Sequence, residues 1–201
     1  MRTILNPRFS SSIVTSLEMS FWSGPLLVLW LYLPGYLANT AAMLGGKWIP
    51  DLTGFEPRPI DGGRRLSDGN RVLGDGKTWN GLAGAIIGAG LLCMLTHLIG
   101  ENTVVANGIF LDPLIGAGTE DWFWIGGEWG AAFVLGAFLG LGCMIGDSTG
   151  SFIKRRLGKK REGSESSEAP LIDTLPFAIC TFFMGMLLFP CLLYTSPSPR
   201  D

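Results

Sequence analysis

Charged and hydroxyl side chains follow a long apolar stretch at residues 146–156, where the sequence reads GDSTGSFIKRR. If one helix continues through them, four side chains spaced i, i+4, i+7 and i+8 share a face: Asp147, Ser151, Lys154 and Arg155. A carboxylate with a hydroxyl one turn later suits Mg²⁺, and two cations a further turn on suit phosphate oxygens. A membrane-orientation signal would explain the basic residues but not Asp147, because a carboxylate at a membrane boundary is costly and marks function by default.

A second polar cluster occupies residues 73–81, LGDGKTWNG, just before another apolar stretch. Its two glycines allow tight turns and the close approach of a ligand to the backbone. Lys77 and Thr78 then open a helix, whose free N–H groups favour phosphate. The spacing of a P-loop is absent, so phosphate binding and a capped turn are equal alternatives on the residues alone. The candidate residues here are Gly74, Asp75, Gly76, Lys77 and Thr78.

A third carboxylate, Asp173, stands at the start of the last apolar stretch. Together with Asp75 and Asp147 it would lie on one side of the membrane among many cations. This combination of carboxylates and cations suits a metal–nucleotide complex, since Mg²⁺ takes few protein ligands and shares the rest with phosphates. We expect Asp147 and Asp173 to help hold the divalent cation.

The composition indicates that membrane helices position these residues. The chain is 47% hydrophobic and 16% charged, with a mean hydropathy of +0.35, whereas soluble domains are about a quarter charged. A helix needs about 20 apolar residues to cross a bilayer core. We predict an all-α, polytopic transmembrane protein with a short tail at residues 1–20 and four spans: Phe21–Leu44, Gly81–Gly100, Trp129–Gly146 and Thr174–Pro190.

Lys and Arg residues gather in two of the three loops between these spans. Loops 45–80 and 148–172 are rich in both, whereas loop 101–128 has neither and is acidic. Cytoplasmic loops carry the excess of basic residues, so we expect a multi-pass cell-membrane protein whose site faces the cytoplasm. The acidic loop lacks the spacing of a calcium site. His97 is expected to be a hydrogen-bonded structural residue, and the four cysteines to be apolar packing residues.

The last residues, 191–201, read CLLYTSPSPRD and look like the in-frame translation of a transposase sequencing adapter. The alternative is a natural Ser/Pro-rich tail. We therefore divide the chain into the tail 1–20, a membrane-embedded domain 21–190 that is incomplete at its C-terminus, and a non-native tail 191–201. No function is assigned to the last segment.

The polar clusters resemble motifs of the archaeal CDP-archaeol synthases, relatives of the bacterial phosphatidate cytidylyltransferases. The family pattern LGDGKTWRG stands here as LGDGKTWNG, with Asn80 in place of a basic residue. The pattern GDxxGSFIKRRLG is present at residues 146–158, and PAYVAN is similar to PGYLAN at residues 34–39. PLLDQLDF corresponds to PLIDTLPF at residues 170–177, where Pro176 replaces a second Asp, so Asp173 alone is carried over.

The resemblance implies a Mg²⁺-dependent cytidylyltransferase. CTP and 2,3-bis-O-geranylgeranylglycerol 1-phosphate, an isoprenoid ether-lipid phosphate, would give CDP-archaeol and pyrophosphate. Membrane lipids are the other expected partners, a nucleic-acid polymer is not expected, and a homodimer is left open. Family members close with a further span and a polar motif, so a fifth span would be lost by truncation, which leaves open the activity of the chain as written.

The placement of the residues and the resemblance together give the candidate residues their expected roles. The catalytic group is Asp75, Lys77, Asp147, Lys154, Arg155 and Asp173. The substrate-binding group is Gly74, Gly76, Lys77, Thr78, Ser151 and Arg155, and the metal ligands are Asp147 and Asp173.

Three alternatives are weighed against this function. A phosphatidate cytidylyltransferase would act on a diacyl lipid. A CDP-alcohol phosphotransferase would use a CDP-lipid, but Asp68–Arg71, DGNR, is too short a match to its Asp-rich motif. A non-catalytic scaffold or small transporter would not bind nucleotide and would not need the charged residues that gather on one side: Asp75, Lys77, Asp147 and Asp173.

Overall fold

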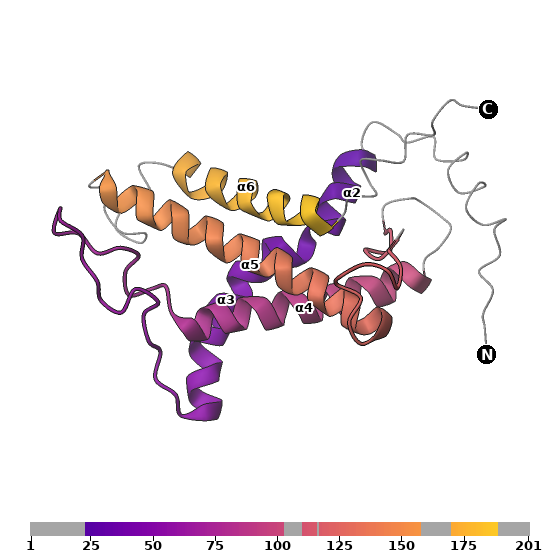
Figure 1. Cartoon of the computed structure of the whole chain (residues 1–201), viewed down its shortest axis with the longest axis horizontal. Helices are drawn as coiled ribbons and strands as arrows, with labels where there is room; N and C mark the ends of the chain where they lie inside the picture. The colour runs from indigo at the N-terminus through magenta and orange to yellow at the C-terminus, as the bar shows by residue number, and fades with distance from the viewer. Residues whose placement is uncertain (1–22, 103–109, 116, 158–169, 189–201) are drawn as a thin grey trace.

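A computed structural model describes residues 23–102, 110–115, 117–157 and 170–188 (Figure 1). The tails expected at residues 1–20 and 191–201 lie outside these ranges. Within them the named elements are all α-helices, joined by a loop with two isolated β-bridges. The helices are α2 (Ser23–Leu31), α3 (Leu33–Thr53), α4 (Trp79–Asn102), α5 (Gly127–Arg156) and α6 (Pro170–Leu188).

The first apolar stretch forms two helices that meet at a bend. Helices α2 and α3 meet at Tyr32 with a bend of 40°. Pro34 lies in the first turn of α3, where the N–H that proline lacks would have no helical partner. Helix α3 then continues to Thr53 and ends at Gly54, which has a φ of 72° and donates its N–H to the carbonyl of Pro50 at 2.8 Å. The expected loop 45–80 therefore begins nine residues late, because polar residues beyond the apolar stretch remain helical.

Close contacts between small residues hold the helices together. A Cβ at Gly45 of α3 would lie 2.5 Å from the Cα of Gly84 in α4. In α5, a Cβ at Gly140 would lie 2.8 Å from the carbonyl oxygen of Ala85 in α4. Small residues let backbones approach in this way in membrane proteins. Since α4 and α5 run antiparallel, the beginning of α4 lies beside the end of α5 (Figure 1).

Helices α4 and α5 are each long and apolar enough to cross a membrane, and the bent pair α2–α3 makes a third candidate if it counts as one span. In α6 the apolar helix counted for this purpose, Thr174–Leu188, is shorter. The all-helical class is confirmed, and the described residues give two or three candidate spans rather than the four predicted.

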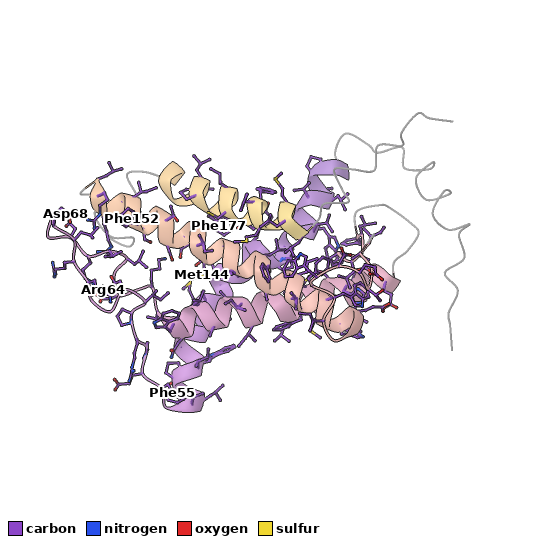
Figure 2. The ribbon with its side chains drawn as sticks, viewed as in Figure 1. Phe55, Arg64, Asp68, Met144, Phe152 and Phe177 are labelled. Atoms are coloured by element: carbon purple, nitrogen blue, oxygen red, sulfur yellow. The ribbon has the colours of Figure 1, made fainter. Side chains whose placement is uncertain are left out.

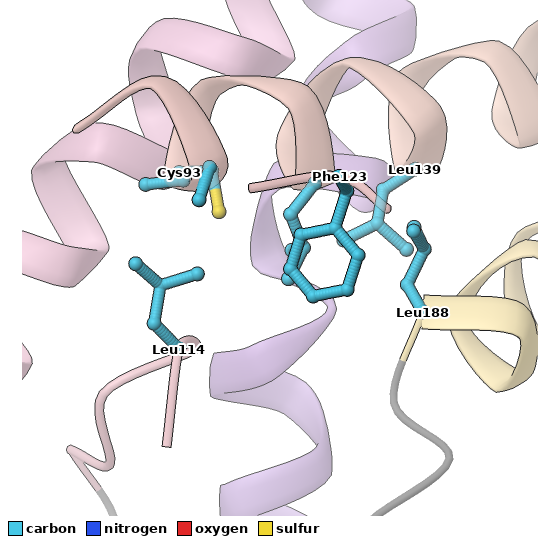
Figure 3. Packing of buried hydrophobic residues seen from close by; sticks show 8 residues of the cluster. Cys93, Leu114, Phe123, Leu139 and Leu188 are labelled. Atoms are coloured by element: carbon cyan, nitrogen blue, oxygen red, sulfur yellow. The ribbon is translucent and has the colours of Figure 1, made fainter. Parts of the chain in front are cut away.

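The end of the bundle away from the basic loop is closed by a packed cluster that includes Leu114, Phe123 and Leu139 (Figure 3). Beside it His97 is 3% exposed, and its Nδ1 lies 2.8 Å from Asp112 Oδ1. This confirms a hydrogen-bonded structural histidine. Cys93 and Cys143 are buried as expected, and Cys191 lies outside the described residues.

Candidate functional site

A cavity of about 540 Å³ lies where α4 begins and α5 ends. Its walls come from α3, from the loop before α4, and from α4 and α5 themselves. Met144, which is labelled in Figure 2, belongs to the α5 wall. The polar lining residues are Asn39, Asp75, Lys77, Thr78, Asp147, Ser151, Lys154 and Arg155, and Gly76 lies among them. Apart from Gly74 and Asp173, every catalytic, binding or metal candidate named from the sequence therefore lines this one cavity.

The end of α5 supplies one wall in the way that the spacing predicted. Helix α5 runs without a break through the polar residues to Arg156. Its four candidate side chains consequently line the same cavity. Asp147 is nearest the apolar part of α5, and Lys154 and Arg155 are nearest the C-terminal end of the helix. The prediction that these residues share a face is confirmed.

Lys77 and Asp147 form an ion pair across the cavity, joining the loop to α5. The two side chains are only 14% and 20% exposed, respectively. Lys77 is directed there by a tight turn in which its backbone N–H donates to the carbonyl of Gly74 at 3.2 Å. The pair balances a half-buried carboxylate, whose charge would otherwise be costly at this depth.

Arg155 lies against the backbone of the glycine-containing turn. Its Nε donates to the carbonyl oxygen of Leu73 at 2.7 Å. The guanidinium covers Gly74 so closely that a Cβ there would lie 1.9 Å from Nη2, and Gly74 also has a φ of 102°. The positive φ favours glycine at this position, and the absence of a side chain lets the guanidinium lie against the backbone. Gly74 therefore lies against the Arg155 guanidinium and does not itself line the cavity.

The start of α4 is a capped turn. The hydroxyl oxygen of Thr78 accepts from the N–H of Gly81 at 3.1 Å, and the N–H of Trp79 donates to the carbonyl of Arg58 at 3.1 Å. These N–H groups are already paired within the protein. The cations around the cavity, rather than these two N–H groups, are therefore the main attraction for an anion.

Asp61 was not singled out from the sequence, yet it organises the loop. Its carboxylate is 1% exposed and accepts from Arg71 Nη2 at 2.6 Å and from the N–H groups of Gly63, Leu73 and Gly74, each at 3.0 Å. Burial raises the pKa of Asp61, but these hydrogen bonds outweigh it and hold the pKa well below the ordinary value. The available signal was the Asp-Gly-Gly turn.

Arg156 was not a candidate either, because the helical spacing that relates the four residues of the α5 face does not include it. Arg156 is the last residue of α5, and its side chain contacts the loop before α4. Its Nη2 donates to the carbonyl of Arg71 at 2.6 Å, and its Nη1 pairs with Asp68. At the tip of the loop, Asp68 (Figure 2) accepts from the N–H of Asn70 at 3.0 Å. The last turn of α5 thus holds the loop over the cavity.

A divalent cation would find a small donor set in the described part of the chain. Asp147 offers a carboxylate and Ser151 a hydroxyl one turn away. No group of three or more His, Cys, Asp or Glu residues gathers among the residues described. Mg²⁺ can bind through one or two carboxylates together with substrate phosphates, and Asp147 and Ser151 are oxygen donors of that kind. Asp173 lies in the first turn of α6, and its side chain is outside the described part.

Comparison with known proteins agrees with these motifs. The family model described as CDP-archaeol synthase matches residues 24–195. The CDP-archaeol synthase of Methanopyrus kandleri is 37% identical over 83% of this chain and 70% of its own length, and that of Thermococcus gammatolerans is 35% identical over 87% and 84%.

A solved structure is also similar, that of "an intramembrane enzyme for archaeal membrane lipids biosynthesis". It has 28% sequence identity and a TM-score of 0.55, and the match covers 80% of this chain and 77% of that chain. With its charged cavity at a helix boundary and with relatives matched over most of its length, the chain belongs to the CDP-archaeol synthase family.

Proposed function

We propose that this chain transfers CMP from CTP to 2,3-bis-O-geranylgeranylglycerol 1-phosphate, giving CDP-archaeol and pyrophosphate. The observation that carries the proposal is the cavity, which gathers Lys77, Asp147, Lys154 and Arg155 from two segments far apart in sequence. Its volume of about 540 Å³ lies within the roughly 300–1,000 Å³ of small-molecule sites. The family's activity supplies the reaction.

In this reaction an oxygen of the lipid phosphate attacks the α-phosphorus of CTP. The bond from that phosphorus to the oxygen bridging to the β-phosphate breaks, and pyrophosphate leaves with the electron pair. The attacking phosphate is already ionised near neutral pH, so catalysis consists of positioning and charge neutralisation. We assign the neutralisation to Lys77, Lys154 and Arg155, whose side chains line the cavity.

Asp147, with Ser151, would hold Mg²⁺, and Asp173 is proposed as a second ligand. When bound, the cation would neutralise phosphate charge and orient the triphosphate. Because the carboxylate of Asp147 is paired with Lys77, a metal–nucleotide would compete with Lys77 for that carboxylate. Lys77 can then move to phosphate oxygens, so that both charges stay paired.

An apolar groove favours a lipid over a soluble acceptor. It measures about 400 Å³ and adjoins the charged cavity, with which it shares Leu73 and Met144. Its other walls include Leu82 and Phe152. A hydrocarbon chain can lie against such a surface while its phosphate reaches the charged residues.

We also propose the finer topology of four spans with the cavity on the cytoplasmic side. The support is the charge on the two ends of α4 and α5. The cavity end carries the loop arginines and Lys154–Arg156, and the other end carries Glu101, Asp112 and Glu120. Basic residues favour the cytoplasmic side, where CTP is available.

The direct test measures transfer of label from α-³²P-CTP into lipid by the purified full-length protein with Mg²⁺. The expected result is a labelled CDP-lipid with an equal amount of pyrophosphate. The diacyl analogue, phosphatidic acid, should be a poorer acceptor, and equal rates would favour the phosphatidate cytidylyltransferase alternative. If no label enters lipid and CTP does not bind, the enzymatic proposal fails and a scaffold or transporter is favoured.

A further inference from the structure

The carboxylate of Asp61 forms more hydrogen bonds than holding one turn requires. It accepts from two nitrogens of Arg71, at 2.6 and 3.4 Å, and from three backbone N–H groups. The N–H donor of Gly63 belongs to the carboxylate's own turn. Those of Leu73 and Gly74 lie 12 and 13 residues away in the segment that leads into the cavity. Asp61 therefore connects the outer loop to the segment with the candidate phosphate-binding residues.

The same backbone segment holds Arg155. The peptide unit that joins Leu73 to Gly74 presents its two sides to different partners: the N–H of Gly74 faces Asp61, and the carbonyl of Leu73 accepts from Arg155 Nε at 2.7 Å. A peptide unit is planar. Fixing its N–H therefore also fixes the direction of its carbonyl, and with it the acceptor that holds Arg155.

Because Gly74 has no side chain, the Arg155 guanidinium can lie close to the backbone. The α-carbon of Gly74 lies directly under the guanidinium, where a Cβ would lie 2.5 Å from Cζ of Arg155. A small rotation of the backbone at this point would move the surface on which Arg155 rests. The guanidinium lines the cavity, so the geometry of the loop is transmitted to the site by a single side chain.

We propose that Asp61 is a positioning residue for CTP binding: it fixes the Leu73–Gly74 peptide unit, which in turn aims the Arg155 guanidinium at the nucleotide. Asp61 does not touch the cavity and acts through its neighbours. The proposal rests on the proposed function, since it needs the cavity to bind a nucleoside triphosphate.

A purely structural role would give a different pattern. If Asp61 only stabilises the loop, its replacement lowers the melting temperature but leaves CTP affinity of the folded protein unchanged. If it acts through Arg155, its effect on affinity depends on whether Arg155 is present. Residues that do not touch each other usually have additive effects, so a departure from additivity identifies the connection.

The test compares Asp61→Asn, Arg155→Met and the double variant, in the full chain in detergent, by titration with CTP and Mg²⁺. The amide introduced by Asp61→Asn is the same size as the carboxylate but directs N–H donors at other donors. We expect Asp61→Asn to raise the CTP dissociation constant about 10-fold, which corresponds to losing one hydrogen bond to a charged group. In the Arg155→Met background the same substitution should change it less than twofold.

Asp68→Asn is the matched control. Asp68 also accepts from a loop N–H two residues on and pairs with an arginine of α5, but it has no hydrogen bond to the 73–77 segment among the described contacts. Its replacement should leave CTP affinity within about twofold of the parent. Equal loss of affinity in Asp68→Asn and Asp61→Asn would overturn the proposal, because any loosening of the loop would then suffice.

Two further results would overturn it: a CTP dissociation constant within twofold of the parent for folded Asp61→Asn, or fully additive losses with Arg155→Met. If Asp61→Asn does not fold, Gly74→Ala tests the same connection, because its Cβ would displace the guanidinium. Unchanged affinity in Gly74→Ala would refute the connection.

Amide hydrogen exchange separates this inference from the proposed function. If the parent binds no CTP, the proposed function fails, and exchange at the N–H groups of Leu73 and Gly74 still reports the local geometry. Both should exchange at least tenfold faster in Asp61→Asn than in the parent and stay protected in Asp68→Asn. Unchanged exchange would show that Asp61 does not fix this peptide unit.

Discussion

At the scale of single residues, the pairing of Lys77 with Asp147 connects two roles that the sequence assigned separately. The lysine was expected to bind phosphate and the aspartate to hold a cation. In the structure each neutralises the other. A Mg²⁺–nucleotide carries both kinds of charge, so it can replace the pair without leaving either group unpaired. This exchange predicts that the metal and the nucleotide bind better together than either binds alone.

Replacing Lys77 by methionine tests the first of these roles. The variant keeps most of the apolar stem and loses the charge. Because a hydrogen bond to a charged group contributes about 1.5–3 kcal/mol, CTP affinity should fall roughly 10- to 150-fold. The measurement is a CTP titration in detergent with Mg²⁺. Lys47→Met, an exposed lysine of α3, is the control and should bind like the parent; equal affinity of the two variants would remove Lys77 from the site.

Replacing Asp147 by asparagine tests the second role. The variant keeps the shape of the side chain but loses the charge expected to bind Mg²⁺, so lipid labelling from CTP should become undetectable while the melting temperature indicates a folded protein. The exposed Asp51→Asn of α3 should retain full activity. Activity of Asp147→Asn within a few-fold of the parent would exclude a metal-binding role.

The sequence predicted the α5 wall because helix periodicity relates Asp147, Ser151 and Lys154 to one another. It did not reveal Asp61, whose partners other than Gly63 lie 10 to 13 residues away in a loop without periodicity. Arg156 was missed for a related reason. Its partners belong to the loop, and no spacing rule within α5 indicates them. Long-range contacts of irregular backbone leave little trace in sequence patterns.

At the scale of helices, close packing at glycines determines how near to one another the helices that line the cavity lie. Gly45 lies against the backbone of Gly84, whereas the next residue, Gly46, has no atom within 4 Å of its would-be Cβ. The sequence shows two adjacent glycines and does not distinguish them. It also predicted a single first span, which holds if the bent pair α2–α3 counts as one span, but an apolar stretch gives no measure of the bend between them.

These two glycines provide a paired prediction. Both would gain helix propensity on replacement by alanine, by up to about 1 kcal/mol. Gly45→Ala must in addition separate α3 from α4, and overpacking costs typically about 1–3 kcal/mol. Thermal unfolding should therefore show a lower melting temperature for Gly45→Ala and an equal or higher one for Gly46→Ala. The same shift in both variants would contradict the packing that the structure shows.

At the scale of the whole molecule, the two ends of the bundle differ in charge and in content. One end holds the basic loop and the cavity, and the other holds acidic residues and the packed cluster around Phe123. Helix α4 has 24 residues and is about 36 Å long at 1.5 Å per residue. A bilayer core is about 30 Å thick, so α4 is long enough to place the two ends on opposite sides of a membrane.

Cysteine labelling can show which end faces the cytoplasm. In a variant without the four native cysteines, Ser67→Cys would mark the exposed cavity-side loop and Thr119→Cys the exposed segment before α5. A membrane-impermeant maleimide should label Ser67→Cys in inverted vesicles and Thr119→Cys in right-side-out vesicles, because basic loops remain in the cytoplasm. Labelling both after permeabilisation confirms that each thiol is reactive. The reverse pattern would place the cavity outside, away from cytoplasmic CTP, and would therefore contradict the proposed reaction as well as the topology.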